Sequence, residues 1–399
     1  MIDFEPDDTP ALKAWRAEVR AFLKEALPDG MRWDYDYDED PENWKKGIDF
    51  WRKVGQKGWV ALTWPKDCYG QERSAIEKWI LAEEFTAYDA PAYPVIGLFV
   101  ADCILRLGTP EQRRRHLKGI AEATTLWGEG YTEPGAGSDL ATLKTRADWD
   151  GSHWVINGQK TFGTAGHFCQ WMAVLARTDQ QAPKHAGISC FLVPLDTPGI
   201  SMAPLHNIAG GRQNHTFFDN VRVPADSVLG DVNQAWNQVW FRMGGEKRDR
   251  AGPVYHDHPY RVVNMVGRLV RYCRETERDG RPISEDPAIR PQLAELLLGA
   301  ETLKMIWREH YGRFASKSVS PFGEAAAALD QIVYKEWWPH LAQKAMEIVG
   351  PLAQIQGGKW ARLQGQIQYF YRTGFGNHAG GTSQLKRMIL ATRGLGLPR

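Results

Sequence analysis

Hydrophobic residues change their spacing twice along the 399-residue chain, and this segregation is the strongest constraint on the fold. Up to about residue 120 they recur every three or four residues, as in amphipathic helices, and the same period returns from about residue 233. Between these regions, short runs rich in aromatic and β-branched residues alternate with turn dipeptides, as in strands. Such segregation excludes a doubly wound α/β sheet and predicts an α+β fold. We expect a helical domain at 1–123, a β-domain at 124–232 and a second helical domain at 233–399.

The two periods also locate individual elements. Asp8 or Thr9 is expected to cap the first helix, and Thr109-Pro110-Glu111-Gln112 to begin the last helix of the first domain. Asp150-Gly151 and Asn157-Gly158 are expected to be turns of an antiparallel meander that closes into a barrel or sandwich. The expected helices are 10–27, 44–57, 73–88, 93–106 and 109–119, then 233–250, 258–278, 287–316, 321–349 and 379–394, with a surface loop at 28–43. The expected strands begin near residue 147 and continue at 171–177, 188–194, 199–205 and 215–223.

Charge and cysteine content narrow the class of protein. The formal net charge is +1, so no strong field attracts the chain to nucleic acid or to an anionic membrane. No apolar run is long enough to span a membrane, and the acidic first residues lack the apolar core of a signal peptide. The five cysteines are scattered without a C-x-x-C pair, which suits a reducing compartment. We therefore expect a cytoplasmic protein whose partner is a small molecule or another protein chain.

A glycine-rich segment, Y-T-E-P-G-A-G-S-D at Tyr131–Asp139, lies where the first domain meets the β-domain. Gly135 and Gly137 allow the backbone to approach a flat or anionic ligand, and Thr132 and Ser138 supply short hydrogen-bonding side chains. Taken alone, such a loop is more often only a tight turn. Whether this loop binds a ligand must therefore be judged together with other segments of the sequence.

Three segments together resemble the FAD-dependent acyl-CoA dehydrogenase family. The Tyr131–Asp139 loop resembles the family's first signature, and Gly158–Gly166 (G-Q-K-T-F-G-T-A-G) resembles its G-x-K-x-(W/F)-x-(T/S) strand and turn. The segment Gly380–Gln384 (G-G-T-S-Q) and the residues that follow it resemble the family's C-terminal ending. The resemblance implies FAD as cofactor, and an N-terminal helical domain, a central antiparallel β-barrel or sandwich and a C-terminal four-helix bundle.

The resemblance also implies contacts for individual residues. Thr132 would hydrogen-bond the pyrimidine edge of the flavin, Phe162 would stack near the ring, and Thr164 would lie near flavin N5. Ser138 would also reach the pantetheine–phosphate part of CoA. The full set of implied cofactor contacts is Tyr131, Thr132, Gly137, Ser138, Phe162, Thr164, Thr382 and Gln384, the last two at the adenosine end of FAD.

The family's reaction removes a proton alpha to the thioester carbonyl while a hydride leaves the β-carbon for flavin N5, which requires a carboxylate base. Many members carry this base directly before G-T-S, where this chain has Gly380. Other members carry it on the first long helix of the C-terminal domain, separated from a Trp by nine residues, and here that spacing joins Trp236 to Glu246. Glu246 is therefore the first choice. Asp249 faces nearly the same side of a helix and stays an alternative, and Arg250 is expected to bind substrate.

A second departure from the family pattern concerns FAD. Where relatives carry an Arg that reaches the FAD phosphates of a neighbouring subunit, this chain has Thr276, which leaves Arg274 or Arg278 to replace it. A flavin-poor partner subunit of a heteromeric acyl-CoA dehydrogenase is therefore an alternative. Monooxygenase, nitroalkane oxidase or desulfinase chemistry on the same fold is another. His256-Asp257-His258 is too small a cluster to predict a metal site, so no metal is expected.

The resemblance finally implies the partners. An acyl-CoA would be the substrate and an electron-transfer flavoprotein the electron acceptor. The chain would form a homo-oligomer, a dimer or tetramer, or a heterotetramer with a related chain. The lack of a carboxylate at Gly380 and the seventeen tryptophans favour a branched, cyclic or steroid-like acyl group over a short linear one, as in fatty acid or steroid degradation.

Overall fold

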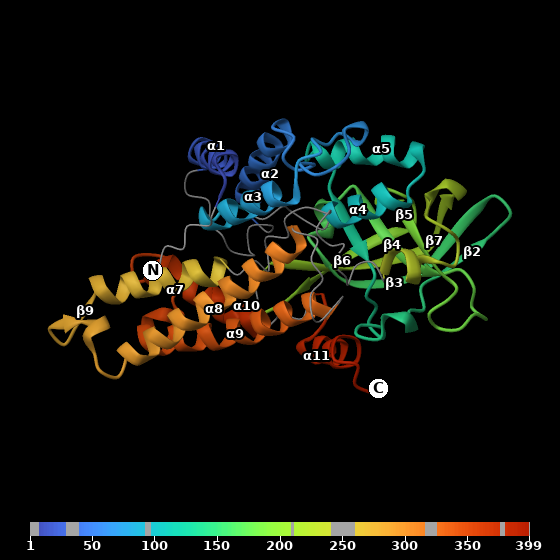
Figure 1. The fold of residues 1–399 in the computed structure, drawn as a ribbon. Helices are drawn as coiled ribbons and strands as arrows, with labels where there is room; N and C mark the ends of the chain where they lie inside the picture. The colour runs from blue at the N-terminus through green and yellow to red at the C-terminus, as the bar shows by residue number, and fades with distance from the viewer. Residues whose placement is uncertain are drawn as a thin grey trace.

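The computed structural model describes residues 8–28, 40–91, 97–208, 211–240, 260–315, 325–375 and 380–398. Its elements follow the predicted order of helices, a mostly antiparallel sheet, and a second set of helices. In Figure 1 the sheet and the C-terminal helices lie toward opposite ends of the molecule, and the N-terminal helices run along one side. The predicted α+β fold is confirmed.

The N-terminal unit contains five α-helices within the described residues, where the helical period predicts them. Thr9 caps the first helix by accepting from the Leu12 N–H, and Thr109 and Gln112 form a capping box at the last. The second begins at Pro41 rather than at residue 44, because Asp40 caps it, so the predicted loop at 28–43 is wrong for its last three residues. The helices are α1 (Pro10–Ala26), α2 (Pro41–Gln56), α3 (Ala75–Ala87), α4 (Gly97–Leu107) and α5 (Pro110–Ala121).

The β-unit is an eight-stranded sheet in the order β6-β7-β3-β2-β4-β5-β8, with β1 paired to β4. Most neighbours are antiparallel, as predicted, but β1 and β4 run parallel. They can do so because the chain passes through β2 and β3 between them, which is long enough for a crossover. The strands are β1 (Trp127–Gly130), β2 (Arg146–Trp149), β3 (His153–Thr164), β4 (Trp171–Arg177), β5 (Ile188–Pro194), β6 (Ile200–His206), β7 (Arg212–Pro224) and β8 (Val228–Leu229).

The turn predicted at Asn157-Gly158 is wrong, because both residues lie inside β3. The pairing of β3 with β7 changes register between Ile156 and Gly158, which marks a β-bulge. Gly158 has a φ of +151°, and a Cβ on it would lie 2.5 Å from Thr145 Oγ1 and 2.7 Å from Thr145 Cα. The glycine therefore serves the bulge and the close approach of another segment rather than a hairpin.

The C-terminal unit is a bundle of long helices that share one apolar core. Its helices are α7 (Tyr260–Glu275), α8 (Arg290–Ala315), α9 (Ala326–Val349) and α10 (Gln366–Phe375), followed by α11 (Ser383–Ile389) and a π-helical turn at Leu390–Gly394. Side chains of α7 to α10 contribute to this core, as the predicted four-helix bundle requires. None of the helices in the described part of the chain is long and apolar enough to cross a membrane.

Several boundaries in this unit differ from the prediction. The helix predicted at 258–278 ends at Glu275, because Asp279 (φ 54°) and Gly280 (φ 75°) form the turn of a short hairpin between β9 (Glu277–Arg278) and β10 (Arg281–Pro282). Helix α10 was not predicted. The helix predicted at 379–394 begins only at Ser383, after two glycines with positive φ. The helix predicted at 233–250 begins as a π-helical turn at Trp236–Trp240, and the rest of it lies outside the described residues.

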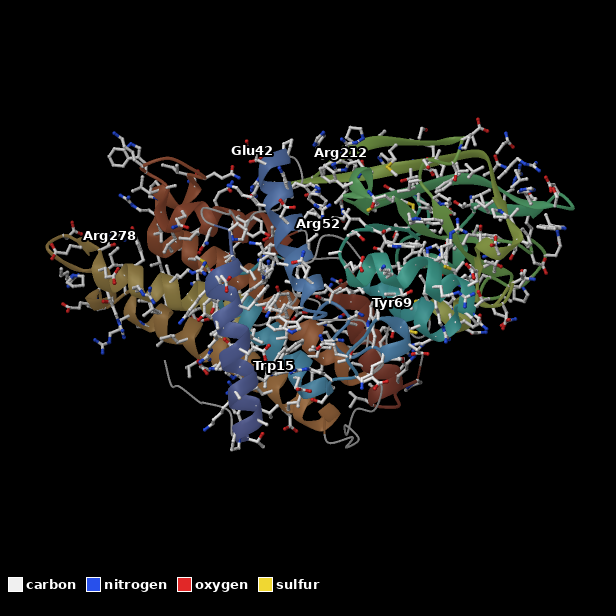
Figure 2. The ribbon with its side chains drawn as sticks, turned by 90° about the horizontal axis from the view of Figure 1, so that it is seen from above. Trp15, Glu42, Arg52, Tyr69, Arg212 and Arg278 are labelled. Atoms are coloured by element: carbon white, nitrogen blue, oxygen red, sulfur yellow. The ribbon has the colours of Figure 1, made fainter. Side chains whose placement is uncertain are left out.

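Helix α2 covers one end of the sheet. In the view of Figure 2, α2, which carries the labelled Glu42 and Arg52, runs on the side of α1 that faces the sheet. Trp44, in the first turn of α2, stacks on Phe168 with ring centroids 4.0 Å apart and an interplanar angle of 13°. Phe168 ends a short 3-10 turn that begins two residues after β3, so this contact places the N-terminal unit against that end of the sheet.

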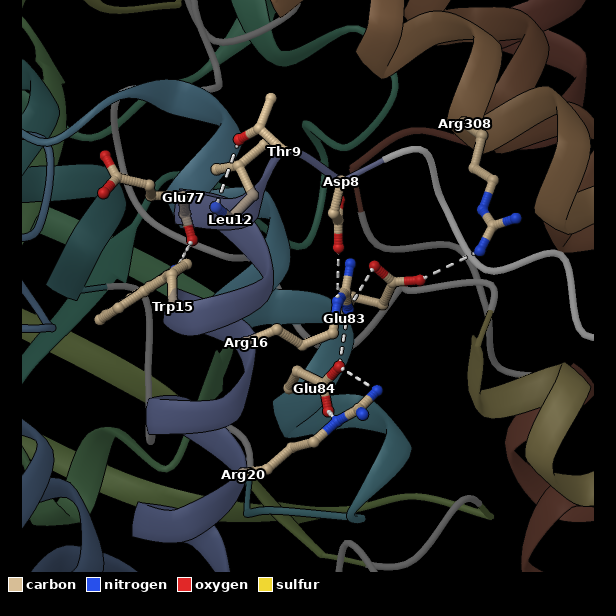
Figure 3. Close-up of polar contacts among 10 residues, drawn as sticks. All are labelled: Asp8, Thr9, Leu12, Trp15, Arg16, Arg20, Glu77, Glu83, Glu84 and Arg308. Atoms are coloured by element: carbon tan, nitrogen blue, oxygen red, sulfur yellow. Dashed lines mark hydrogen bonds and ion pairs between the residues drawn. The ribbon is translucent and has the colours of Figure 1, made fainter.

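Helix α3 joins the N-terminal unit to the bundle through buried charges, drawn in Figure 3. Glu84 accepts hydrogen bonds from Arg16 at 2.6 Å and from Arg20 at 2.8 Å, both on α1. Glu83 contacts Arg16 at 3.1 Å and Arg308 of α8 at 3.4 Å. Only 5% of Glu83 and 2% of Glu84 is exposed, so these charge-assisted bonds fix α1, α3 and α8 relative to one another.

A buried histidine makes the stability of this fold depend on pH. The His116 ring of α5 lies edge-on to Trp127 and Trp171, with centroid distances of 5.1 Å and 4.6 Å. Burial lowers its pKa from 6.5 to about 4. As the pH falls from 6.5 toward 4, the unfolded chain therefore binds a proton that the folded chain does not, and stability is lost. We expect His116→Phe to reduce the loss of unfolding free energy across this window, measured by urea unfolding. An unchanged pH slope would contradict this account.

Candidate functional site

The predicted Tyr131–Asp139 segment leaves the sheet at the end of β1 and forms a compact loop. Glu133 and Ala136 exchange both backbone hydrogen bonds, each 3.1 Å long, which closes its turn. The Thr132 carbonyl accepts from the Thr161 N–H at 2.9 Å. Thr132, a predicted flavin contact, therefore lies beside the end of β3.

A buried ion pair holds this loop against β3. Lys160 Nζ donates to Glu133 Oε1 at 2.8 Å and to the Tyr131 carbonyl at 3.1 Å. The carboxylate also accepts from the N–H groups of Lys144 and Thr145, at 2.7 Å and 2.8 Å. Lys160 is 1% exposed and Glu133 7%. Because both oxygens of the Glu133 carboxylate accept hydrogen bonds, this pair fixes the loop to the sheet.

The electrostatics of the pair keep it charged. Burial lowers the pKa of Lys160 to about 8. Burial by itself raises the pKa of Glu133, but Lys160 and the hydrogen bonds from Thr145 and Lys144 outweigh it and hold that pKa below its usual value. Sequence reasoning missed the role of both residues. The signal was present in the sequence, since Lys160 is the Lys of the G-x-K pattern and Glu133 belongs to the loop signature.

The end of β3 carries a second bulge, which turns Phe162 out of the sheet. The pairing with β7 steps from Lys160–Thr216 to Gly163–Asn214, so that two residues of β3 face one of β7. Phe162 has a φ of +62°, a left-handed backbone that is strained for a bulky residue, and it is 53% exposed. Strain of this kind gathers at functional sites, and an exposed ring offers a flat ligand a surface for stacking.

Strand β7 supplies the amide side chains that hold this bulge. Gln213 Nε2 donates to Thr164 Oγ1 at 3.3 Å and to the Phe162 carbonyl at 3.5 Å. Asn214 is fully buried and donates to the Gly163 carbonyl at 3.1 Å. The structure thus brings the predicted contacts Phe162 and Thr164 to one end of the sheet, next to the loop. Sequence reasoning missed both amides because they lie about 50 residues further along the chain.

Ser138 lies on the exposed side of the same loop. Its neighbour Asp139 pairs with Lys184 of the β4–β5 connection, with 2.9 Å between Oδ2 and Nζ. Arg177, at the end of β4, donates to the carbonyls of Ala141 and Lys184 at 2.8 Å and 3.1 Å. These bonds fix the chain after Ser138 while its hydroxyl faces solvent, where a ligand can reach it.

Gly135 and Gly137 are not required by the packing of the chain itself. Neither has a positive φ, and a Cβ placed on either would have no heavy atom within 4 Å. The packing therefore leaves room at both positions for a ligand to approach the backbone closely.

Gly137→Ala should therefore separate binding from stability. Alanine reduces the conformational freedom of the unfolded chain, so unfolding free energy should stay unchanged or rise by about 0.4–1 kcal/mol. The added methyl group should weaken binding of FAD or acyl-CoA about tenfold. Gly357→Ala, at another uncrowded glycine without positive φ, is the matched control: it should have the same small effect on unfolding free energy and leave ligand affinity unchanged. Urea unfolding and ligand titration measure both, and unaltered ligand affinity in Gly137→Ala would refute the idea.

The predicted adenosine contacts, Thr382 and Gln384, lie at the start of α11, on the C-terminal unit. Thr382 caps this helix by accepting from the Leu385 N–H at 3.2 Å, and Gln384 is exposed. Lys335 of α9 donates to the Gly381 carbonyl at 2.8 Å and so anchors the turn before it. In Figure 1 α11 lies below the junction of bundle and sheet.

Arg278, one candidate for the FAD phosphates, is engaged elsewhere. It donates to the carbonyls of Ile348 and Val349 at 2.9 Å and 3.4 Å, and so caps the end of α9. Arg212 marks the place of the predicted flavin contacts, because its carbonyl accepts from the Ala165 N–H, directly after Thr164. Figure 2 shows the two arginines well apart. Within one chain, Arg278 therefore lies away from the predicted flavin contacts. Arg274 is exposed on α7.

Glu246, Asp249 and Arg250, the predicted catalytic and substrate-binding residues, lie outside the described residues, as does the His256–His258 cluster. The chain leads toward them through Trp236, whose ring lies 4.9 Å from that of His185 in the β4–β5 connection. Their roles stay predictions.

The described residues suit FAD in kind and in placement. An exposed ring at Phe162 matches a flat ligand, and the nearby hydroxyls of Thr132 and Thr164 match its polar edge. The uncrowded glycines leave the loop backbone accessible. This set fits a flavin, and none of its side chains is an acid or a base.

Comparisons with known proteins agree on one family. Residues 9–124 match the acyl-CoA dehydrogenase N-terminal domain, residues 128–221 the middle domain and residues 261–395 the C-terminal domain. Acyl-CoA dehydrogenase IpdE1 of Mycobacterium tuberculosis is 30% identical over 97% of this chain and 98% of its own length. Acyl-CoA dehydrogenase FadE26 of the same organism is 32% identical over 87% of each chain.

Two solved structures are similar over nearly the whole length of the chain. One is described as the Tcur3481-Tcur3483 steroid ACAD, with a TM-score of 0.87, 29% identity, and coverage of 98% of this chain and 99% of that one. The other is the ChsE4-ChsE5 complex from Mycobacterium tuberculosis, with a TM-score of 0.85, 29% identity and the same coverage.

Proposed function

Because the chain belongs to the acyl-CoA dehydrogenase family, whose members are oxidoreductases, we propose that it catalyses the FAD-dependent α,β-dehydrogenation of an acyl-CoA with a steroid-like acyl group. The observation that carries the proposal is the strained and exposed Phe162 beside Thr164 and the Tyr131–Asp139 loop. This is a rigid surface that suits a flat cofactor, and its residues are those that the family resemblance assigns to the flavin.

The residues divide between the two ligands. Phe162 would stack near the flavin, while Thr132 and Thr164 would hydrogen-bond its edge and Tyr131 and Gly137 would line the loop. Ser138 would also bind CoA, and Thr382 and Gln384 would hold the adenosine end of FAD. FAD would supply the oxidant that accepts a hydride from the β-carbon.

The chain's own chemical task is to take the proton from the alpha carbon. A carboxylate can do so only if it is held within hydrogen-bond reach of that carbon's proton and has a pKa matched to the task. Glu246 would fill this role, with Asp249 as the alternative, and Arg250 would bind the substrate beside it.

The acyl group is inferred from the relatives and from the sequence together. The solved structure of similar fold described as a steroid ACAD supports a steroid-like group. Gly380 leaves no carboxylate at that position of the C-terminal segment, and the many tryptophans favour a bulky branched or cyclic substrate over a short linear one.

A second candidate is a flavin-poor partner subunit of a heteromeric enzyme. Thr276 replaces the expected Arg, and Arg278 is bound to the end of α9. The ChsE4-ChsE5 complex, similar to this chain, joins two differently named chains, which supports a heteromeric arrangement over a homo-oligomer. In either arrangement an electron-transfer flavoprotein would accept the electrons.

Flavin content distinguishes the two candidates. The purified chain is expected to show the visible absorbance of bound flavin, and this absorbance should bleach anaerobically with a steroid-like acyl-CoA and not with a short linear one. A folded but colourless chain that gains flavin only with a related chain would support the partner subunit instead. A flavin that no member of an acyl-CoA panel bleaches would overturn the proposed reaction.

A further inference from the structure

We propose that Gln213 is a positioning residue that orients the Thr164 hydroxyl, so that this hydroxyl donates its hydrogen to the bound flavin. The inference rests on the proposed function, since it assumes that FAD binds at Phe162 and Thr164. It assigns a role to a residue of β7 that the family signatures do not include.

The contacts of Gln213 settle which way its amide points. One end reaches the Phe162 carbonyl at 3.5 Å, and a backbone carbonyl can only accept a hydrogen bond. That end is therefore the –NH₂ group. The other end, Oε1, accepts from Asn207 Nδ2 at 3.4 Å. An inverted amide would place its oxygen against the Phe162 carbonyl, and two acceptors cannot hydrogen-bond to each other.

This orientation decides the direction of the Thr164 hydroxyl. The –NH₂ group lies 3.3 Å from Thr164 Oγ1, and as a donor it occupies a lone pair of that oxygen. A hydroxyl carries a single hydrogen, which must then point to a different acceptor. Within the described residues, the bond from Gln213 is the one hydrogen bond that the structure gives to the Thr164 side chain. The half-buried hydroxyl thus keeps its one donor for a ligand.

The backbone around Gln213 is fixed, so the amide is preorganised. Gln213 is paired on one side with Thr164 of β3 and on the other with Leu205 of β6. The next residue, Asn214, is fully buried and binds the Gly163 carbonyl. A side chain that rises from a strand paired on both edges holds its hydrogen-bond partner more precisely than one on a loop.

The test removes or reverses the donor without changing the size of the side chain. Gln213→Met should weaken FAD binding about threefold to tenfold, as the loss of one neutral hydrogen bond implies, and should shift the visible absorption band of the bound flavin. Gln213→Glu should weaken FAD binding and shift the absorption band more strongly than Gln213→Met does. Its carboxylate would accept the hydrogen of the Thr164 hydroxyl and turn it away from the ligand. Gln159→Met is the matched control: Gln159 is an amide of β3 whose side chain contacts His215 instead.

A double-mutant cycle separates orientation from general loss of structure. In a Thr164→Val background, Gln213→Met should have no further effect on the flavin spectrum or on FAD affinity. If Thr164→Val shifts the spectrum while both Gln213 variants leave it unchanged, the inference fails and the proposed function stands. If the effects of Thr164→Val and Gln213→Met simply add, Gln213 acts through the fold and the inference also fails. If wild-type protein takes up no flavin, the proposed function fails and the inference falls with it.

Discussion

Glu246→Gln should slow the anaerobic bleaching of the flavin by acyl-CoA about 10²–10⁴-fold, the usual contribution of a general base. The glutamine side chain has nearly the same shape as glutamate but cannot take a proton from the alpha carbon. FAD content and acyl-CoA binding should persist, because neither requires the charge of the base. Stopped-flow absorbance after rapid mixing measures the rate, and titration of the unreactive variant measures binding.

Asp249→Asn is the matched comparison, because it makes the same change three residues away. If Glu246 is the base, this variant should bleach within about tenfold of the wild-type rate. A full loss in Asp249→Asn with normal bleaching in Glu246→Gln would assign the base to Asp249. Normal bleaching in both variants would show that neither carboxylate takes the proton.

The second large effect is on stability, and it concerns the buried ion pair of Glu133 and Lys160 under the Tyr131–Asp139 loop. Glu133→Gln should lower the free energy of unfolding by about 3–5 kcal/mol, because it leaves the ammonium of Lys160 buried without its carboxylate. Lys160 is only 1% exposed, so water cannot replace the lost partner. FAD binding should weaken as well, since the pair holds the loop that carries Thr132 and Ser138. Urea unfolding followed by tryptophan fluorescence measures the first effect and FAD titration the second.

Two controls test whether the unpaired charge of Lys160 causes the loss of stability. The double variant Glu133→Gln/Lys160→Met removes both charges and should be more stable than Glu133→Gln alone. Glu111→Gln breaks an ion pair with Arg114 in which both side chains are about two-thirds exposed, and it should cost less than about 1 kcal/mol. A double variant less stable than Glu133→Gln would show that the buried charge is not the cause.

Local periodicity predicted the order of the elements and most of their positions. It failed where the same dipeptide can form either a tight turn or a β-bulge. Asn157-Gly158 was assigned to a turn, although the same dipeptide can also form the β-bulge found here. The helix predicted at 258–278 ran past Glu275 into β9, the strand before the Asp279-Gly280 turn. Helix α10 was missed because it is only ten residues long and begins directly after a short 3-10 turn at Arg362–Gly365.

The site was predicted through resemblance rather than periodicity, and only in part. Phe162 and Thr164 were singled out from the sequence, and the structure places them together beside the Tyr131–Asp139 loop. The groups that hold them were not found, because they join residues distant in the chain: 27 positions separate Glu133 from Lys160, and 49 separate Thr164 from Gln213. Local patterns carry no information on such pairs. The cofactor contacts and the base stay predictions.

The most direct test of the central claim is to identify the product. The flavin-containing protein, incubated with a steroid-like acyl-CoA and an electron acceptor, should yield a thioester that has lost two hydrogens, as mass spectrometry would show. The new double bond should lie between the alpha and β carbons. An unchanged thioester, an oxygenated product or a cleaved one, formed by protein that holds its flavin, would contradict the proposed dehydrogenation.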